Sequence, residues 1–270
     1  MLKKSLAILF FIVILVISAH PLLALEVDDY VPASNIKGLS GYYFIDSTQT
    51  LLKGEDKFAL FGIAFGGDLN NFKKGSVEAV LSAGLLDGFE TAIVIPYFNQ
   101  SGNLSGLGDI QISGKVHLLD QISEDIPSLA LALTVELPTG DKNKGFRNVD
   151  SYGGDLELIA DGKIDLIDYS FNLTAEAGIF FQDVGNTRQE KHLRYGGGGF
   201  FPLAGSWVLL LEGTGTSKYG ISQDFGMVSA SLRFFRNRFQ LTGGVDRTIQ
   251  IGTNAPPKGT ALHGSINISF

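Results

Sequence analysis

The chain has 270 residues, a formal net charge of −7 at pH 7 and no cysteine. The lack of cysteine excludes disulfides, thiolate metal sites and lipid attachment through cysteine. The acidic balance argues against nucleic acid as a partner, because a phosphate backbone attracts basic surfaces.

Residues 1–24 have the features of a secretory signal peptide. Lys3 and Lys4 provide a basic start, residues 6–17 are an unbroken apolar run, and small residues follow before the acidic Glu26. The alternative, a membrane anchor, needs roughly 20 apolar residues, and this run is too short. We expect cleavage near Ala24, which leaves 19 basic and 28 acidic residues and a net charge of −9.

Residues 25–56 have a mixed composition, with a short strand expected at 41–45 and a charged turn at 53–57. We predict that they form a periplasmic leader that can enter the barrel mouth as a partial plug.

From residue 57 onward, apolar and polar residues alternate in runs separated by turn residues, which is typical of strands with one apolar and one polar face. The run at 128–137 is the clearest, whereas 58–65 and 208–211 are apolar on both faces and leave the register open. The pattern predicts twelve strands, at 57–67, 76–85, 89–99, 107–119, 128–137, 153–163, 168–181, 192–201, 206–215, 223–235, 238–248 and 258–270.

These strands predict an all-β fold, a closed antiparallel transmembrane β-barrel over residues 57–270. After the signal peptide no stretch reaches 18 consecutive apolar residues, so strands and not helices would cross the membrane. An unpaired backbone group in hydrocarbon costs several kcal/mol, so a sheet there has to close. An even strand count, long loops alternating with short turns, and aromatic residues at both strand ends favour a barrel over a soluble β-sandwich.

The last ten residues add a location to this fold. Leu262, Ile266, Ile268 and Phe270 alternate with polar residues, and the chain stops on the aromatic. This segment resembles the last strand of bacterial outer-membrane β-barrels, which the barrel assembly machinery reads. The resemblance implies the bacterial outer membrane as location, with its lipid and that machinery as partners.

The polar faces of the strands should line a lumen. Two interpretations stay open for the charged residues there: pairing that fixes the interior, or a conduction path that selects a small solute. No metal-ligand spacing and no cofactor motif is evident, so we expect neither group. The candidate lumen-lining residues are Glu78, Asp109, Lys115, His117, Glu136, Asp155, Glu157, Lys163, Glu176, Arg233 and Asp246.

Two further features have a local and a functional interpretation. His263 and Ser265 lie two apart on one strand, as in a barrel phospholipase, but the alternation places both inside and no acidic partner is identifiable, so we assign no catalytic residue. The run Gly196–Gly199 lacks the features of a phosphate loop. It either relieves bending of a strand or lets a bulky group approach the wall.

Two motifs carry a wider resemblance. Gly106-Leu107-Gly108-Asp109-Ile110 opens one strand, and Leu137-Pro138-Thr139-Gly140-Asp141 closes the next. Together they resemble the outer-membrane barrels of the MetA pathway of phenol degradation, which carry no agreed functional residues. The resemblance implies a passive channel for small molecules, with aromatic or hydrophobic compounds among the candidates. The alternative is a structural or adhesive barrel that acts through its outer loops; an enzyme is disfavoured.

Overall fold

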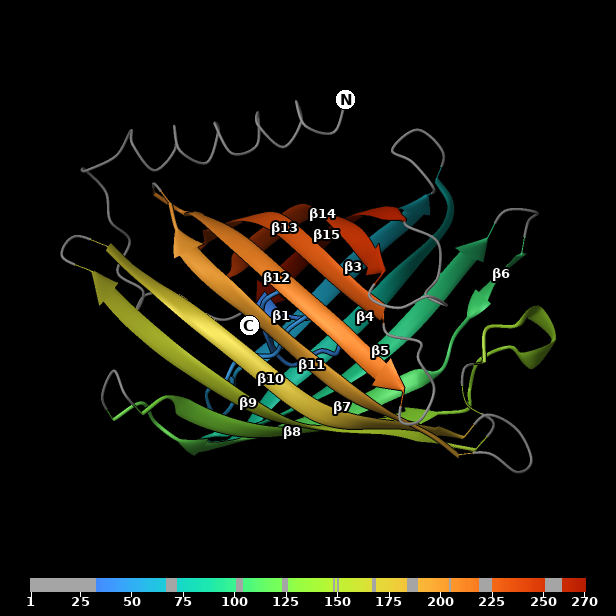
Figure 1. The fold of residues 1–270 in the computed structure, drawn as a ribbon, viewed down its shortest axis with the longest axis horizontal. Helices are drawn as coiled ribbons and strands as arrows, with labels where there is room; N and C mark the ends of the chain where they lie inside the picture. The colour runs from blue at the N-terminus through green and yellow to red at the C-terminus, as the bar shows by residue number, and fades with distance from the viewer. Residues whose placement is uncertain are drawn as a thin grey trace.

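A computed structural model describes residues 33–66, 72–100, 104–122, 126–147, 149, 151–166, 169–183, 189–203, 205–218, 225–250 and 259–270. The predicted leader residues 25–32, the signal peptide and several outer loops lie outside this described part. Figure 1 shows tilted strands that wrap into a barrel around a short inner segment.

The barrel wall is an antiparallel sheet of twelve strands, and the first strand pairs with the last. The four-residue β6 and the longer β7 together form one wall strand, since both pair with β5. The wall strands are β3 (Asp56–Gly66), β4 (Phe72–Leu86), β5 (Phe89–Gln100), β6 (Leu104–Leu107), β7 (Ile110–Leu119), β8 (Ser128–Leu137), β9 (Gly153–Leu166), β10 (Tyr169–Asp183), β11 (Gln189–Pro202), β12 (Trp207–Lys218), β13 (Phe225–Arg236), β14 (Phe239–Gln250) and β15 (Thr260–Ser269).

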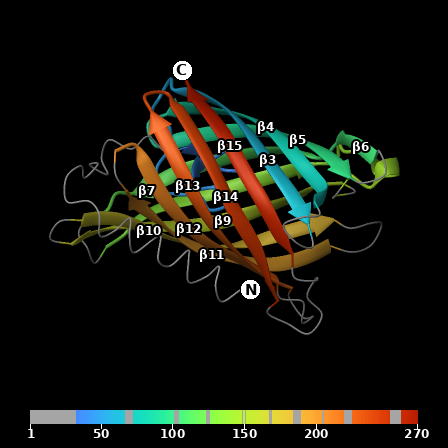
Figure 2. The same ribbon diagram turned by 90° about the horizontal axis from the view of Figure 1, so that it is seen from above.

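The closure of the barrel joins β15 to β3. Ten residue pairs are in register there, from Thr260 opposite Gly66 to Ser269 opposite Lys57. Figure 2 shows the two strands side by side, although almost the whole chain separates them in sequence. The predicted closed antiparallel barrel is therefore confirmed, with strand bounds within a few residues of the expected ones.

The strand expected at 107–119 is interrupted, which the alternation did not predict. Gly108 and Asp109 leave the ladder between β6 and β7. Thr139 lies at the break, where its side-chain oxygen accepts a hydrogen bond from the Ile110 backbone at 2.8 Å. The loop after β8 then turns through a short 3₁₀ helix, Lys142–Lys144.

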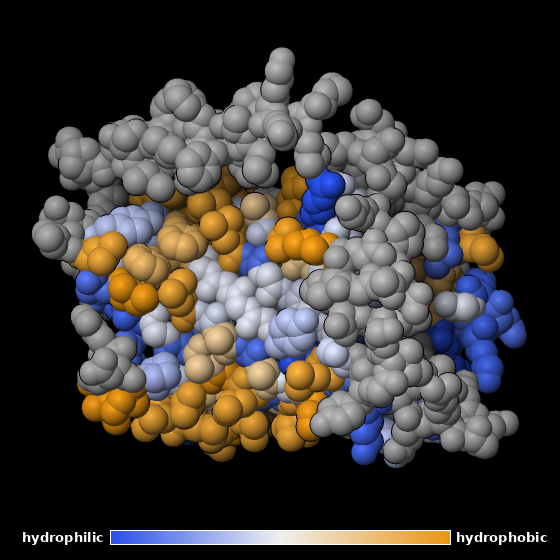
Figure 3. All heavy atoms as spheres, in the orientation of Figure 1, coloured by the Kyte–Doolittle hydropathy of each residue, from blue (hydrophilic) through white to orange (hydrophobic). Residues whose placement is uncertain are grey.

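The outer face of the wall is apolar and exposed. Leu81, Leu133, Leu158, Leu232 and Ile266 are each at least 40% exposed. In Figure 3 apolar residues cover β8 and β9, and hydrophilic ones gather at the end that carries β6. A continuous apolar exterior on a soluble protein would be an aggregation surface, whereas lipid solvates it.

Among the described residues we find no helix long and apolar enough to cross a bilayer.

Residues 33–51, hereafter the internal segment, lie inside the barrel (Figure 1). The segment forms a small hairpin, in which β1 (Ala33–Ser34) pairs with β2 (Ser40–Gly41), and then runs on through bends. The expected strand at 41–45 is thus wrong beyond Gly41. Apart from Ile36, Gln49 and Thr50, the residues of the internal segment are buried against the inner face of the wall.

One of the aromatic residues at the strand ends does not face lipid as expected. Phe200, near the end of β11, points into the barrel and packs with Tyr42 and Ile45. Phe200 and Gly198 are two residues apart on the strand, so both face the inside of the barrel. A Cβ added at Gly198 would lie 3.2 Å from the Tyr42 ring. The glycine run therefore lets a bulky group approach the wall.

Candidate functional site

Glu212 on β12 and Arg233 on β13 hold the middle of the internal segment. The Glu212 carboxylate accepts hydrogen bonds from the backbone N–H groups of Tyr43, Phe44 and Ile45, at 3.1, 2.7 and 3.1 Å. Arg233 donates to the carbonyl oxygens of Gly41, at 3.2 Å, and Tyr42, at 2.7 Å. Successive N–H groups that converge on one carboxylate form an anion-binding nest, so wall side chains take the place of a sheet partner for this backbone.

On the opposite wall Glu90 and Lys115 do the same. Glu90 accepts from the backbone and hydroxyl of Ser40, at 2.6 and 2.7 Å, and from the Leu51 backbone at 2.9 Å. Lys115 donates to the carbonyl oxygens of Ser40 and Ser47, both at 2.7 Å. The two side chains pair at 3.0 Å and are almost fully buried, so each neutralises the other while it binds the segment.

A third group of charges binds the tip of the hairpin. The Lys37 ammonium contacts Asp46 at 3.1 Å and also contacts Glu157 on β9. Arg194 on β11 pairs with Glu157 at 3.1 Å and with Asp155 at 3.2 Å. Two cations and three carboxylates thus form a chain that ties the segment to β9 and β11.

These charges shift the pKa values within the internal segment. Burial alone would raise the pKa of Asp46, but the nearby ammonium groups of Lys37 and Lys115 lower it below its ordinary value. Burial and Arg194 oppose protonation of Lys37, yet the carboxylates around it raise its pKa well above the ordinary value. Both groups therefore stay charged around neutral pH.

Within the described part of the chain, Asp46, Glu157 and Glu176 form the group whose geometry comes closest to a metal site. Their carboxylate oxygens lie within 4.8 Å of one another and all three are buried. However, the Lys37 ammonium lies against two of them, and Glu176 accepts a hydrogen bond from the Asp46 backbone at 3.1 Å. Lys37 thus supplies the cation, and the donor set is that of an ion-pair network.

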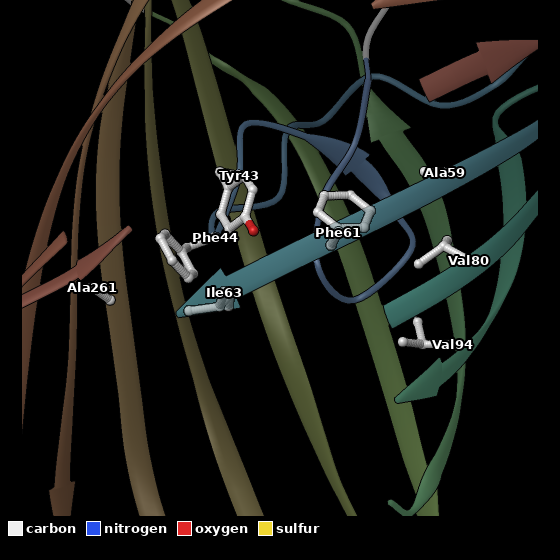
Figure 4. Close-up of a cluster of buried hydrophobic side chains, with 8 residues drawn as sticks. All are labelled: Tyr43, Phe44, Ala59, Phe61, Ile63, Val80, Val94 and Ala261. Atoms are coloured by element: carbon white, nitrogen blue, oxygen red, sulfur yellow. The ribbon is translucent and has the colours of Figure 1, made fainter. Parts of the chain in front are cut away.

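An apolar cluster fills one side of the lumen. Tyr43 and Phe44 of the internal segment pack against Phe61 and Ile63 of β3 (Figure 4). The Tyr43 hydroxyl also donates to the Gly62 carbonyl at 3.2 Å. Burial of these aromatic side chains adds to the polar contacts in holding the segment against the wall.

A cavity of about 270 Å³ adjoins this cluster. Met227 packs against the cluster and lines the cavity from β13. Its lining is Ile36, Phe44, Ile63, Arg194, Thr214, Gly215, Thr216, Met227 and Asp246.

The eleven side chains predicted to line the lumen lie in three environments. Lys115, His117, Glu157, Glu176 and Arg233 contact the internal segment directly. Asp155 binds Arg194, Asp246 lies beside His263, Glu136 is buried, and Glu78 lies near Tyr43, whose pKa is raised by burial and also by this carboxylate. The other two lie toward the barrel ends: Lys163 is about one-third exposed beside Asp165, and Asp109 binds a loop.

Sequence reasoning missed four charged wall residues that hold the segment or its charges: Glu90, Asp161, Arg194 and Glu212. Asp161 accepts from the backbone of Thr48 at 2.6 Å. The alternation of the strands could have placed Arg194 and Glu90 inside the barrel, because the residues next to each of them face outward. Glu212 follows the run 208–211, which is apolar on both faces and gave no register.

His263 has an acidic partner that the sequence did not reveal. Its Nδ1 lies 2.8 Å from Asp246, and its Nε2 lies 2.7 Å from the hydroxyl of Ser231, not of Ser265. Register explains the pairing: Gly244 lies between Ser231 and His263 on adjacent strands and leaves room for the contact. The order of groups is that of an acid–histidine–serine relay, but neither the Asp246 oxygens nor His263 Nδ1 makes a hydrogen bond, so the relay is not formed. All three are buried and the Tyr43 ring covers the imidazole at 3.9 Å, so in this arrangement a substrate cannot reach the hydroxyl.

The two sequence motifs meet in space at one end of the barrel. Asp109, 1% exposed, accepts hydrogen bonds from the backbone of Gly140 at 2.7 Å and of Val149 at 3.1 Å. The aspartate of the first motif therefore anchors the loop that the second motif opens.

Comparison with known proteins now assigns a family. The sequence model of "Putative MetA-pathway of phenol degradation" matches residues 37–263. The chain belongs to this family. The match spans both motifs, the wall strands from β3 to β14, the start of β15 and most of the internal segment, which confirms the resemblance inferred from the motifs. No curated protein matches the chain.

Solved structures share the barrel of this family member. The NanC porin in its rhombohedral crystal form superposes with a TM-score of 0.58 at 9% identity, covering 78% of this chain and 98% of that one. The COG4313 outer membrane channel from Pseudomonas putida F1 gives 0.55 at 16% identity, covering 83% and 98%. With its closed wall and apolar exterior, the chain is a bacterial outer-membrane β-barrel.

Proposed function

We propose that the protein is a passive outer-membrane channel for small molecules, and that the internal segment is a partial plug. The observation that carries the proposal is the contrast between the two faces of the wall. Outside, exposed apolar residues face lipid, and inside, charged residues line the path. A water-filled path lined by charges offers a polar solute a lower barrier than the bilayer does.

The relatives support this proposal through their folds. NanC is a porin and the COG4313 protein is an outer membrane channel, so barrels of this size and topology serve as conduits. The family description points to small aromatic compounds, which we include among the candidate solutes.

The plug proposal accounts for the number of contacts to the internal segment. Glu90, Asp161, Glu212, Lys115 and Arg233 come from five wall strands and all bind its backbone. A segment held from every side narrows the lumen and leaves passage only beside it. Residues 1–24 would then serve as the signal peptide, and the C-terminal strand would engage the barrel assembly machinery.

Solute flux in liposomes tests the channel. Purified full-length protein, shown to be folded by a gel mobility that changes on boiling, is reconstituted and mixed with neutral sugars of increasing size. We expect swelling with arabinose and a loss of swelling with larger oligosaccharides. Folded protein that passes no sugar and no ion would overturn the proposal.

A further inference from the structure

We propose that the passage beside the internal segment selects cations over anions, and that Asp246 on β14 determines this selectivity. The proposal rests on the channel function and adds the charge class of the solutes that pass. Three features of the lumen carry it: a buried carboxylate without a hydrogen bond, a charge network whose cations are all offset, and a cavity that both of them border.

Asp246 is the buried carboxylate without a hydrogen bond. Its side chain is 2% exposed, and neither of its oxygens has a hydrogen-bond partner among the described residues. His263 Nδ1 lies 2.8 Å away but makes no hydrogen bond, and the other nitrogen of this ring lies 2.7 Å from the Ser231 hydroxyl. A buried charge is normally paired, because its removal from water costs free energy. Asp246 therefore keeps a negative field that a passing cation can offset.

The charge network around the hairpin tip does not counteract this field. Two cations lie among four carboxylates there: Lys37 and Arg194 among Asp46, Asp155, Glu157 and Glu176. One oxygen each of Asp155 and Glu176 is buried without a hydrogen bond, whereas no ammonium or guanidinium nitrogen of the described buried side chains is left in this way. The network therefore adds no net positive charge that would attract anions.

Asp246 and Arg194 line the same cavity of about 270 Å³. Arg194 is the single cation among the lining residues, and its guanidinium is paired with two carboxylates, at 3.1 and 3.2 Å. Phe44 and Ile63, which Figure 4 shows pointing toward the same region, belong to the apolar part of the lining. Apolar walls screen charge poorly, so they focus the field of the Asp246 carboxylate on an ion inside the cavity. The cavity therefore concentrates cations beside the internal segment.

Reversal potentials in planar bilayers test the selectivity. Full-length, heat-modifiable protein is recorded in a gradient of potassium chloride at about pH 8, where an unperturbed imidazole is neutral. We expect the permeability of potassium to exceed that of chloride. One unit charge at about 6 Å in water changes the local concentration of a monovalent ion about threefold, so Asp246→Asn should lower the permeability ratio by about threefold or more.

Two further variants separate the charge of Asp246 from its packing. Asp246→Glu keeps the charge and should keep the ratio, although it changes the shape of the side chain more than Asp246→Asn does. A merely structural role predicts instead that Asp246→Glu disturbs the ratio at least as much. Asp87→Asn, in the exposed turn between β4 and β5, removes a carboxylate outside the lumen and should leave the ratio unchanged.

A matched pair on β12 tests the cavity without a change at Asp246. Thr216→Lys places an ammonium group in the cavity lining and should lower the ratio. Ser217→Lys places the same group on the same strand but outside the lining, and should leave the ratio unchanged. This pair decides the question if Asp246→Asn does not fold.

Equal permeabilities, or a preference for chloride, in the wild-type protein would overturn the proposal. A ratio that stays unchanged in Asp246→Asn, or in Thr216→Lys, would overturn the role of Asp246 and its cavity. Current steps without a cation preference overturn the selectivity alone, whereas folded protein without steps overturns the channel.

Discussion

The Glu212 carboxylate lies 2.7 Å from the backbone nitrogen of Phe44, and the N–H groups on either side point to it as well. One wall side chain thus satisfies three consecutive donors of a segment that enters the barrel from far away in the sequence. Hydrogen bonds to a charged acceptor each contribute about 1.5–3 kcal/mol. Together with Glu90 on the opposite wall, which also accepts three hydrogen bonds, this nest attaches the internal segment to the barrel.

Glu212→Gln should loosen the segment. The amide keeps the size of the side chain, but its NH₂ group then faces N–H donors and leaves at least one of them unsatisfied, at a cost of about 1–3 kcal/mol. We expect larger and noisier single-channel currents than in wild type. Asp87→Asn in the exposed turn between β4 and β5 is the control for an acid-to-amide change, and currents identical in all three proteins would contradict the nest's role.

Gly38 permits a test of how closely the segment fits. Its φ is +85° and an added Cβ would lie 2.5 Å from the Cβ of Ala92, whereas Gly54 has φ +81° and open space around it. Both alanine substitutions should pay the left-handed backbone cost of about 1–2 kcal/mol. Only Gly38→Ala should also displace the segment.

We therefore expect Gly38→Ala to lower the temperature at which the folded gel band is lost more than Gly54→Ala does, and to raise conductance. Equal effects of the two substitutions would show that the segment does not pack on Ala92.

The chain lacks cysteine, so a disulfide can report where the segment lies. The hydroxyl oxygens of Ser34 and Ser82 are 3.0 Å apart, one on the internal segment and one on β4. The double variant Ser34→Cys/Ser82→Cys should oxidise in intact cells and change its mobility on a non-reducing gel. Pairing Ser34→Cys with Leu81→Cys, which faces outward next to Ser82, should give no disulfide; comparable oxidation in both pairs would refute the placement.

Acidification should release the hairpin tip. Because the pKa of Asp46 is lowered in the folded protein, its carboxylate stabilises the segment above its ordinary pKa of about 3.9, and this contribution is lost as pH falls through the lowered value. The raised pKa of Lys37 gives a contribution that is complete below about 10.4 and is lost only as pH rises through the raised value. The groups that face this pair are Lys115, Arg194, Glu157 and Glu176.

Conductance should therefore increase as pH falls below the ordinary pKa of Asp46, about 3.9. Lys37→Met removes the cation and leaves Asp46 and Glu157 without it, so its currents at pH 7 should already resemble those of the wild type in acid. A wild-type current that is the same at neutral pH and at about pH 2 would contradict the assignment.

Asp109 should protect the loop that it anchors. With Asp109→Asn, one oxygen remains as an acceptor and the NH₂ group faces the second backbone donor, from Gly140 or Val149. Trypsin should then cleave after Lys142 or Lys144 faster than in wild type. An unchanged cleavage rate, with Asp87→Asn as the matched control, would show that the two motifs do not depend on this contact.

The sequence was sufficient for the wall because alternation is a local property. Residues 128–137 and the terminal strand could be placed since each apolar residue alternates with a polar one. The partners across the lumen are not local: Glu212 binds Phe44 and Lys115 binds Ser40, and both contacts depend on how a closed barrel wraps. The pair of Ser231 with His263 likewise depends on a two-strand register and on Gly244 between them.

Single-channel recording of the full-length protein in planar bilayers tests the central claim most directly. The account predicts discrete current steps from folded, heat-modifiable protein, with small amplitude because the internal segment narrows the lumen, and larger steps in Glu212→Gln. Folded protein that gives no steps in either form would contradict it.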